Sequence, residues 1–192
     1  MKRKRSKHFI LLSTDSLLST SEGFTLIELM VVIAIIGIIL ILAIPNLGGM
    51  QQKARIRAGA QQIAQDFRQI RERSLSKGIV YRVTFNTTNK REYTVTYTNI
   101  HDSVRTATYK LGSAGGGNLI FGHTGVSVYP PEGWGAPPAD GIDFTNNILD
   151  FDNRGGADRG IVYITDNREN YAVGVNRLGK VKVYRYKNGQ WY

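Results

Sequence analysis

Cysteine is absent from the 192 residues of this chain. Its absence excludes a disulfide framework, a thiolate metal site and a cysteine nucleophile. Because the chain has no thiols, its sequence does not indicate the redox state of the compartment in which it works. The folded part must be held together by packing of its side chains rather than by covalent cross-links.

Histidine is almost as scarce, because the chain has only three: His8, His101 and His123. They lie far apart in the sequence, and no nucleophile motif, phosphate-binding loop or metal-ligand spacing accompanies them. The sequence therefore argues against an enzyme and predicts no cofactor.

Aspartates are concentrated in one stretch, where they raise the question of calcium, since oxygen-rich loops bind that ion. They are Asp140, Asp143, Asp150, Asp152 and Asp158. Their spacing fits no known ligand loop, and aspartate is common in turns. We therefore predict no metal site, and a calcium site is the alternative.

The chain is basic, with 25 Lys and Arg against 15 Asp and Glu and a net charge of +10. Five of these bases and two of the acids lie within residues 1–23. Without that segment 20 bases and 13 acids are left, which is a net charge of +7. Anionic lipid head groups, nucleic acid and acidic proteins are all admissible partners, and charge alone does not choose among them.

Residues 24–44 read FTLIELMVVIAIIGIILILAI and contain a single charged residue, Glu28. At 1.5 Å per residue this run is just long enough to cross the roughly 30 Å hydrocarbon core of a bilayer, so we predict a transmembrane helix. The basic cluster before it should stay cytoplasmic, which leaves the rest of the chain exported. A secretory signal peptide is the competing interpretation, but no small-residue cleavage site follows the run.

A small residue instead precedes the run, in the sequence Gly23-Phe24-Thr25-Leu26-Ile27-Glu28. This arrangement resembles the N-terminal signal of type IV prepilins and type II secretion pseudopilins. The resemblance implies a leader peptide at residues 1–23, cleavage by a prepilin peptidase between Gly23 and Phe24, and N-methylation of Phe24. It also implies assembly with other pilin or pseudopilin subunits at an inner-membrane assembly platform.

The acid at position 28 has a physical reason to take part in assembly. A carboxylate inside hydrocarbon costs on the order of 2.5–3.5 kcal/mol, so Glu28 needs a partner. Cleavage after Gly23 would create a cationic amine on Phe24, about one helical turn away. Glu28 can pair with that amine on its own helix or on a neighbouring subunit, and the second pairing would favour assembly and set its register. The alternative is a chance acid that reaches the membrane surface.

Beyond Pro45 apolar residues recur every three or four positions: Ile56, Ala60, Ile63, Phe67 and Ile70. This spacing predicts an amphipathic helix over residues 45–77 that packs its apolar stripe on the following domain. With a kink at Pro45, the helix is expected to be nearly continuous from about residue 24. Its basic residues lie mostly off the stripe, which indicates a solvated face or, as the alternative, a contact with lipid head groups or other subunits.

From residue 78 the pattern changes to alternating β-branched and aromatic residues. Strands are predicted at residues 79–85, 92–97, 105–111, 119–128, 148–151, 160–165, 171–176 and 180–186. No helical period interrupts them, which favours antiparallel sheets over a parallel α/β fold. We predict an α+β chain whose long N-terminal helix packs on a β-rich, sandwich-like domain at residues 78–192, an order that matches the pilin-like plan.

A second and weaker resemblance lies in the tail, at residues 161–185. This segment is similar to the closing β-hairpin of the GspH/FimT group of minor pseudopilins, with lysines where that group has arginines. In the last predicted strand one face carries Lys180, Lys182, Tyr184 and Tyr186. Such a face can bind phosphates and stack on bases.

Some members of the GspH/FimT group bind DNA through this tail. The resemblance therefore gives four candidate DNA-binding residues: Lys180, Lys182, Tyr184 and Arg185. An ordinary exposed strand face is the interpretation that we favour.

The favoured function is structural. We expect a minor pseudopilin of a type II secretion system or type IV pilus-like filament, held in the inner membrane by a single span, with a periplasmic domain that enters a periplasmic or surface filament. The competing hypothesis is a minor pilin that binds DNA through its basic tail during natural transformation. A third is a plain single-span anchor for an unrelated domain, which would not be cleaved at Gly23.

Overall fold

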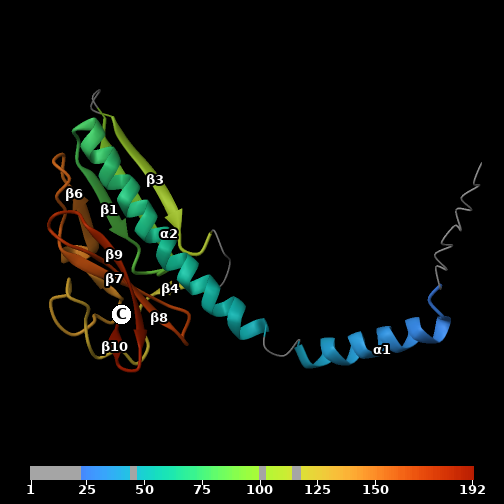
Figure 1. The fold of residues 1–192 in the computed structure, drawn as a ribbon. Helices are drawn as coiled ribbons and strands as arrows, with labels where there is room; N and C mark the ends of the chain where they lie inside the picture. The colour runs from blue at the N-terminus through green and yellow to red at the C-terminus, as the bar shows by residue number, and fades with distance from the viewer. Residues whose placement is uncertain (1–22, 44–46, 100–102, 114–117) are drawn as a thin grey trace, which may run out of the picture. The chain divides into compact units, whose positions relative to one another are not determined.

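The computed structural model describes residues 23–43, 47–99, 103–113 and 118–192. The chain divides into two compact units, residues 1–45 and 46–192, each described here by itself. The first unit contributes the helix α1 (Leu26–Ala43). The second contains the long helix α2 (Leu47–Lys77) and all the described strands (Figure 1).

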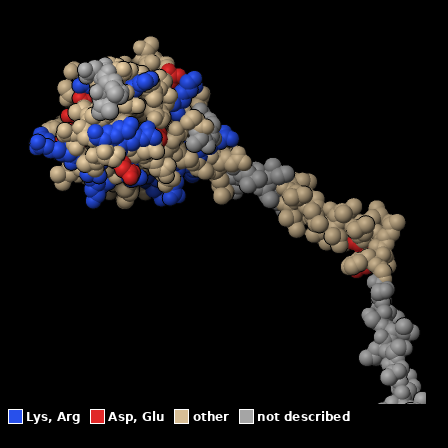
Figure 2. Space-filling model, turned by 90° about the horizontal axis from the view of Figure 1, so that it is seen from above, with Lys and Arg blue, Asp and Glu red and all other residues tan. Residues whose placement is uncertain are grey.

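The helix α1 has a surface that is almost free of charge. Its large apolar side chains are exposed within this unit, from Val32 at 44 % to Leu26 at 77 %, and the contrast with the basic second unit is plain in Figure 2. Among the described residues, no helix is both long and apolar enough to cross a membrane. The predicted kink at Pro45 and the continuity of the two helices concern residues 44–46, which lie outside the described residues.

The helix α2 buries its apolar stripe. Each of the five residues of the stripe has 2 % or less of its surface exposed: Ile56, Ala60, Ile63, Phe67 and Ile70. The helix ends at Gly78, which has a φ of +67° and donates its N–H to the carbonyl of Ser74 at 2.9 Å. Glycine adopts this left-handed conformation at little cost, so it stops the helix at the point where the sheets begin.

Two antiparallel sheets follow α2. The first has the order β3-β2-β1-β6. Its strands are β1 (Tyr81–Phe85), β2 (Glu92–Thr98), β3 (Val104–Lys110) and β6 (Ile148–Phe151), the last preceded by the short 3-10 helix η2 (Thr145–Asn147).

The second sheet has the order β10-β9-β8-β7-β4, and β5 also pairs with β7. Its strands are β4 (Ile120–Phe121), β5 (Ile142–Asp143), β7 (Gly160–Thr165), β8 (Asn170–Val175), β9 (Val181–Lys187) and β10 (Gln190–Trp191).

The core joins α2 to both sheets, because the helix contacts β1 and β6 of the first sheet and β7, β8 and β9 of the second. Phe67 lies at its centre, with the rings of Phe85, Tyr93 and Phe151 at centroid distances of 6.1, 6.3 and 6.2 Å. Burial of apolar surface contributes about 25 cal/mol per Å², so this cluster is the main source of stability. The arrangement confirms the predicted α+β class with antiparallel sheets.

A second, smaller cluster lies on the opposite face of β7 and β8. It consists of Ile161, Tyr163 and Ala172, with Tyr184 and Trp191 packed against it. Side chains alternate between the two faces of a strand, so β7 and β8 supply one set to each cluster. Both strands are consequently buried along their whole length.

One predicted strand, at residues 119–128, is wrong beyond Phe121. The chain turns at Gly122, where the backbone of Gly141 lies so close that an added Cβ on Gly141 would be 2.2 Å from the Gly122 nitrogen. Gly141 has a φ of +78°, so this approach needs glycine for both space and conformation. The prediction also missed β5 and β10, because two residues are too few to show an alternating pattern.

Part of the basic face of α2 is an intramolecular contact rather than a solvated surface. Arg68 Nη2 donates to the carbonyl of Val181 at 3.2 Å, and Arg71 Nε donates to that of Gly155 at 2.8 Å. The buried Ser74 hydroxyl donates to the carbonyl of Asp152. These three side chains tie α2 to the end of each sheet.

Candidate functional site

The first residues of α1 are positioned by a local cap. Thr25 precedes the helix, and the N–H of Glu28 lies 3.2 Å from the Thr25 hydroxyl and 3.1 Å from the Thr25 carbonyl. A threonine followed by an acid three residues later is the pattern of a capping box, in which the hydroxyl satisfies one of the free N–H groups at the helix start. The sequence itself therefore fixes where α1 begins.

The Gly23–Phe24 peptide bond lies just before this cap. Gly23 and Phe24 are outside the helix and exposed, and 83 % of the Phe24 surface is accessible. A peptidase needs an extended, accessible backbone rather than a helical one, because helical N–H and C=O groups are already paired. The predicted cleavage site lies outside the helix and is accessible.

Glu28 is the one charged residue of α1 and lies in its first turn. A carboxylate in this position is favoured by the helix dipole, which makes the N-terminal end partly positive. The side chain of Glu28 is exposed and forms no ion pair among the described residues. Its carboxylate is free for a cation outside the described structure.

The candidate residues of the tail do not form one surface. Lys180 and Lys182 are exposed, as the prediction requires. The Tyr184 hydroxyl instead donates to Glu132 Oε2 at 2.7 Å, and its ring packs on the second cluster. Burial, followed by the contact with Glu132, raises the pKa of Tyr184. This tyrosine serves the fold and is not free to stack on a base.

Arg185 lies on the other face of β9, with Val181 and Val183, which pack in the main core. Its Nη2 contacts Glu169 Oε2 at 3.1 Å, and Lys53 of α2 lies 3.9 Å from the same carboxylate group. The hydrogen bond to Glu169 raises the pKa of Arg185. Arg185 therefore does not share the face of β9 that carries the two lysines, because successive residues of a strand point to opposite faces.

A long loop before β5 contacts the second cluster, with Gly133 beside Ile161 and Glu132 bonded to Tyr184. No pattern in the sequence indicates how this loop is held. Arg159 donates to the carbonyls of Pro131, Glu132 and Gly133 at 2.8, 3.0 and 3.3 Å. Its guanidinium also lies 4.4 Å from the ring centroid of Trp134, a cation–π contact. Arg159 thus holds this loop through three hydrogen bonds and one cation–π contact.

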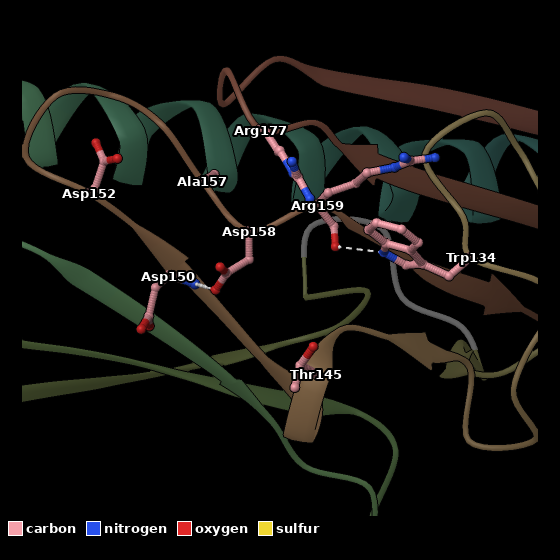
Figure 3. A pocket seen from close by; sticks show the side chains of 8 residues that line it. All are labelled: Trp134, Thr145, Asp150, Asp152, Ala157, Asp158, Arg159 and Arg177. Carbon is pink, nitrogen blue, oxygen red and sulfur yellow. Dashed lines mark hydrogen bonds between the residues drawn. The ribbon is translucent and has the colours of Figure 1, made fainter.

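A hollow of about 480 Å³ lies beside that loop (Figure 3). It is lined by Trp134, Thr145, Asp150, Asp152, Ala157, Asp158, Arg159 and Arg177. The three aspartates in it had been candidates for calcium. Figure 3 shows that their carboxylates do not converge on one point, and among the described residues no three His, Cys, Asp or Glu side chains could hold a metal ion together.

Each of these carboxylates has a partner within the chain. Asp150 accepts two hydrogen bonds from Arg82 at 2.9 and 2.7 Å. Asp158 accepts from the N–H of Asp150 at 3.0 Å, and Asp152 accepts from two N–H groups of its own turn. The other two candidates have similar roles, because Asp140 accepts from the N–H of Ile142, and Asp143 from that of Trp134.

Of the three histidines, His123 alone falls within the described residues. Its Nε2 lies 3.2 and 3.1 Å from the carbonyls of Pro137 and Pro138. His123 therefore helps to hold the loop. Among the described residues, no nucleophilic side chain is hydrogen-bonded to it. His8 and His101 lie outside the described residues.

The family comparison concerns the N-terminal segment. A model described as the prokaryotic N-terminal methylation motif matches residues 18–44. The N-terminal segment of the chain carries this methylation motif. This match confirms the resemblance that Gly23 to Glu28 indicate. The matched segment includes the predicted cleavage site, the cap at Thr25 and all of α1.

The solved structures that are similar to this chain include three of minor pilins or pseudopilins. Two are of the minor pseudopilin EpsH from the type II secretion system of Vibrio cholerae, with 12 % and 13 % identity and TM-scores of 0.45 and 0.44. The matched regions cover 67 % and 68 % of this chain, and 95 % and 94 % of the two EpsH chains. The third is the type IV minor pilin FimU of Pseudomonas aeruginosa, with 8 % identity, a TM-score of 0.49, and coverage of 74 % of this chain and 96 % of its own. No curated protein matches the chain.

Proposed function

We propose that this chain is a structural subunit of a pilin-like filament, made as a precursor that a prepilin peptidase cuts between Gly23 and Phe24. The observation that carries the proposal is the position of that peptide bond, which is exposed and stands immediately before the helix cap at Thr25. Cleavage there would leave α1 intact and add a cationic amine at its start. N-methylation of that amine on Phe24 belongs to the same proposal, on the strength of the methylation motif.

Anchoring follows from the surface of α1. Its eighteen residues span about 27 Å at 1.5 Å per residue, which is short of the roughly 30 Å of a hydrocarbon core, but the apolar run of the sequence extends over residues 24–44. Apolar side chains on all sides of a helix need an apolar environment, which a bilayer or the helices of neighbouring subunits would supply. We infer a single-pass anchor in the inner membrane before assembly, with the basic residues of 1–23 on the cytoplasmic side and the β-rich unit in the periplasm.

The pairing of Glu28 with the new amine gives assembly its specificity. Within one helix the pair would be satisfied locally, whereas a pair between two subunits would hold them in one register. Other subunits of the filament and an inner-membrane platform that inserts them are the partners that this role requires. The system could be a type II secretion machine or a type IV pilus, and the chain would act as a scaffold in either.

Mass spectrometry of the N-terminus tests the proposal. The protein is isolated from its native membrane as the unchanged chain, the Gly23→Ala variant and, as a control, Gly37→Ala, which lies within α1 away from the cleavage site. The unchanged chain and the control should begin at methylated Phe24, and the Gly23→Ala variant should stay uncut. An uncut wild-type chain would withdraw the proposal and leave a tethered β domain.

DNA binding through the tail is the second candidate, favoured by the exposure of Lys180 and Lys182. Two lysines on two phosphates contribute about 1.4 to the slope of log affinity against log salt for a single strand. A single-stranded oligonucleotide titrated at rising salt should lose that contribution when both lysines become alanine. Lys187→Ala, also exposed on β9, serves as the control. Absence of binding at low salt would remove this candidate.

A further inference from the structure

The strand β3 forms one edge of the four-stranded sheet (Figure 1). Six of its seven residues are exposed, and only Tyr109 is partly buried. Exposure of consecutive residues means that both faces of the strand are open, because neighbouring side chains point in opposite directions. No described part of the chain covers β3.

The hydrogen-bond register shows which backbone groups of β3 are free. The N–H of Leu111 donates to the carbonyl of Arg91 at 2.7 Å, and bonded positions recur at every second residue of an antiparallel pair. The residues that bond to β2 are therefore Arg105, Ala107 and Tyr109. The residues that turn their N–H and C=O outward are Val104, Thr106 and Thr108.

Among the described strands, the other sheet edges are covered, short or only partly open, since β10 pairs with the last residues of β9. The strand β3 is an edge over its whole length. The outer side of β6 is covered by the segment 156–158, through an N–H bond from Asp150 to the Asp158 carboxylate and one from Asp158 back to the Asp150 carbonyl. The edge strands β4 and β10 have only two residues each. Proteins usually cover, shorten or distort a free edge, because it is a template for a further strand.

The side chains of β3 indicate the charge of that further strand. The strand carries Arg105 and Lys110 and no acid. Lys110 is 3.5 Å from Glu92 on β2, whereas Arg105 has no ion pair among the described residues. In a pairing on the outer edge Arg105 would occupy a position without direct hydrogen bonds, where the two strands approach to about 4.5 Å between Cα atoms. A carboxylate opposite it would be in close contact.

We propose that β3 docks an extended segment of another protein, which adds to the sheet as an antiparallel strand and places an acidic side chain opposite Arg105. Main-chain hydrogen bonds from Val104, Thr106 and Thr108 supply the attachment, and the charge pair selects the segment and its register. This surface does not include the N-terminal motif, so the docking proposal can be tested independently of the proposed function.

Two short peptides test the docking. One is Thr-Val-Thr-Val-Thr-Glu-Thr, which places its acid opposite Arg105 in antiparallel register, and the other has Lys in place of Glu. Each is titrated into the full chain held in detergent, with amide exchange followed residue by residue by NMR. In the free chain the amides of Ala107 and Tyr109 should exchange slowly, and those of Thr106 and Thr108 quickly. The acidic peptide should slow the exchange of the last two.

Two variants separate docking from general effects. Thr108→Pro removes an outward N–H without touching the ladder to β2, so binding should be lost while Ala107 stays protected. Arg105→Glu should reverse the preference, from about two- to fivefold in favour of the acidic peptide to a similar factor in favour of the basic one. If the proline variant unfolds, the charge reversal still decides.

Three results would overturn the proposal. The first is the absence of any change at Thr106 and Thr108 with either peptide at millimolar concentration. The second is equal binding of the acidic and basic peptides. The third is a concentration-dependent dimer of the chain alone that Thr108→Pro abolishes, which would assign the edge to a second copy instead of an acidic segment.

Discussion

The hydroxyl of Tyr93 on β2 donates a 2.5 Å hydrogen bond to Asp66 Oδ2 on α2. Tyr93 is fully buried in the main core, and Asp66 lies beside Phe67 at the edge of the apolar stripe. Burial raises the pKa of Asp66, and the bond to Tyr93 opposes that rise. The pair is one of the polar connections between α2 and the first sheet, with those of Gln62 to Lys110 and Ser74 to Phe151.

Replacing Tyr93 by phenylalanine should destabilise the second unit by about 1–3 kcal/mol, the usual cost of leaving a buried polar group without its partner. Tyr97→Phe is the matched control, because its ring stacks on Tyr81 and its hydroxyl has no hydrogen bond in the described structure. That variant should stay within about 0.5 kcal/mol of the unchanged chain. Urea unfolding at pH 7 measures both, and equal losses in the two variants would contradict the role assigned to the Tyr93 hydroxyl.

The pH dependence of stability should change in the Asp66→Asn variant. The pKa of Asp66 in the folded chain is raised above its usual value of 3.8, so the folded state holds its proton more tightly than the unfolded state. The contribution of this group is therefore complete below pH 3.8 and is lost as the pH rises through the raised pKa.

Asparagine cannot titrate but can still accept the bond from Tyr93. The difference in unfolding midpoint between the Asp66→Asn variant and the unchanged chain should therefore shift in favour of the variant from pH 3.5 to pH 7. Comparison at each pH cancels the titration of other acids, such as Asp143, whose pKa burial also raises. Parallel stability curves for the two proteins would show that Asp66 ionises freely in the folded state.

The main elements of the second unit could be predicted because their residues repeat. The stripe on α2 recurs every three or four residues, and the longer strands alternate, so burial of one face follows from the sequence alone. The turn at Gly122 could not be predicted, because it depends on Gly141, which lies 19 residues away in the sequence. The contact between Tyr184 and Glu132 could not be predicted either, because the loop that carries Glu132 has no repeating pattern of apolar residues.

The start of α1 depends on a local sequence signal. Thr25 and Glu28 are three residues apart, and their role at the helix start follows from the capping pattern. For the tail, the alternation that joined Lys180 and Lys182 also places Arg185 on the opposite face with Val181 and Val183. The contact of Arg185 with Glu169, which directly precedes the neighbouring strand β8, could not be predicted from the sequence.

A further prediction concerns Gly174 on β8. A Cβ at this position would lie 2.8 Å from Glu132 Oε2, so alanine should displace Glu132 and break its bond with Tyr184. The loop that carries Glu132 also carries Trp134, one of two tryptophans in the chain. We expect a loss of about 1–3 kcal/mol and an altered tryptophan fluorescence.

Gly48→Ala is the control for Gly174→Ala. Gly48 lies in the first turn of α2, and an added Cβ there has no described atom within 4 Å. Alanine at this position should leave the fluorescence unchanged and alter the stability by less than about 1 kcal/mol. If Gly174→Ala behaves like this control, the loop does not depend on the Glu132–Tyr184 contact.

The last prediction separates cleavage from assembly at α1. Glu28→Gln keeps the length of the side chain and the backbone cap on Thr25 but removes the charge that would pair with the amine of Phe24. The Gly23–Phe24 bond stays before an intact helix start, so cleavage should continue, whereas the fraction of subunits recovered in sheared filaments should fall at least about tenfold, which corresponds to about 1.4 kcal/mol of lost pairing. Glu72→Gln, an exposed acid on α2, should assemble normally. Filaments that form equally well from both variants would mean that Glu28 is needed only for the helix start, and the register of subunits would then have to come from the second unit.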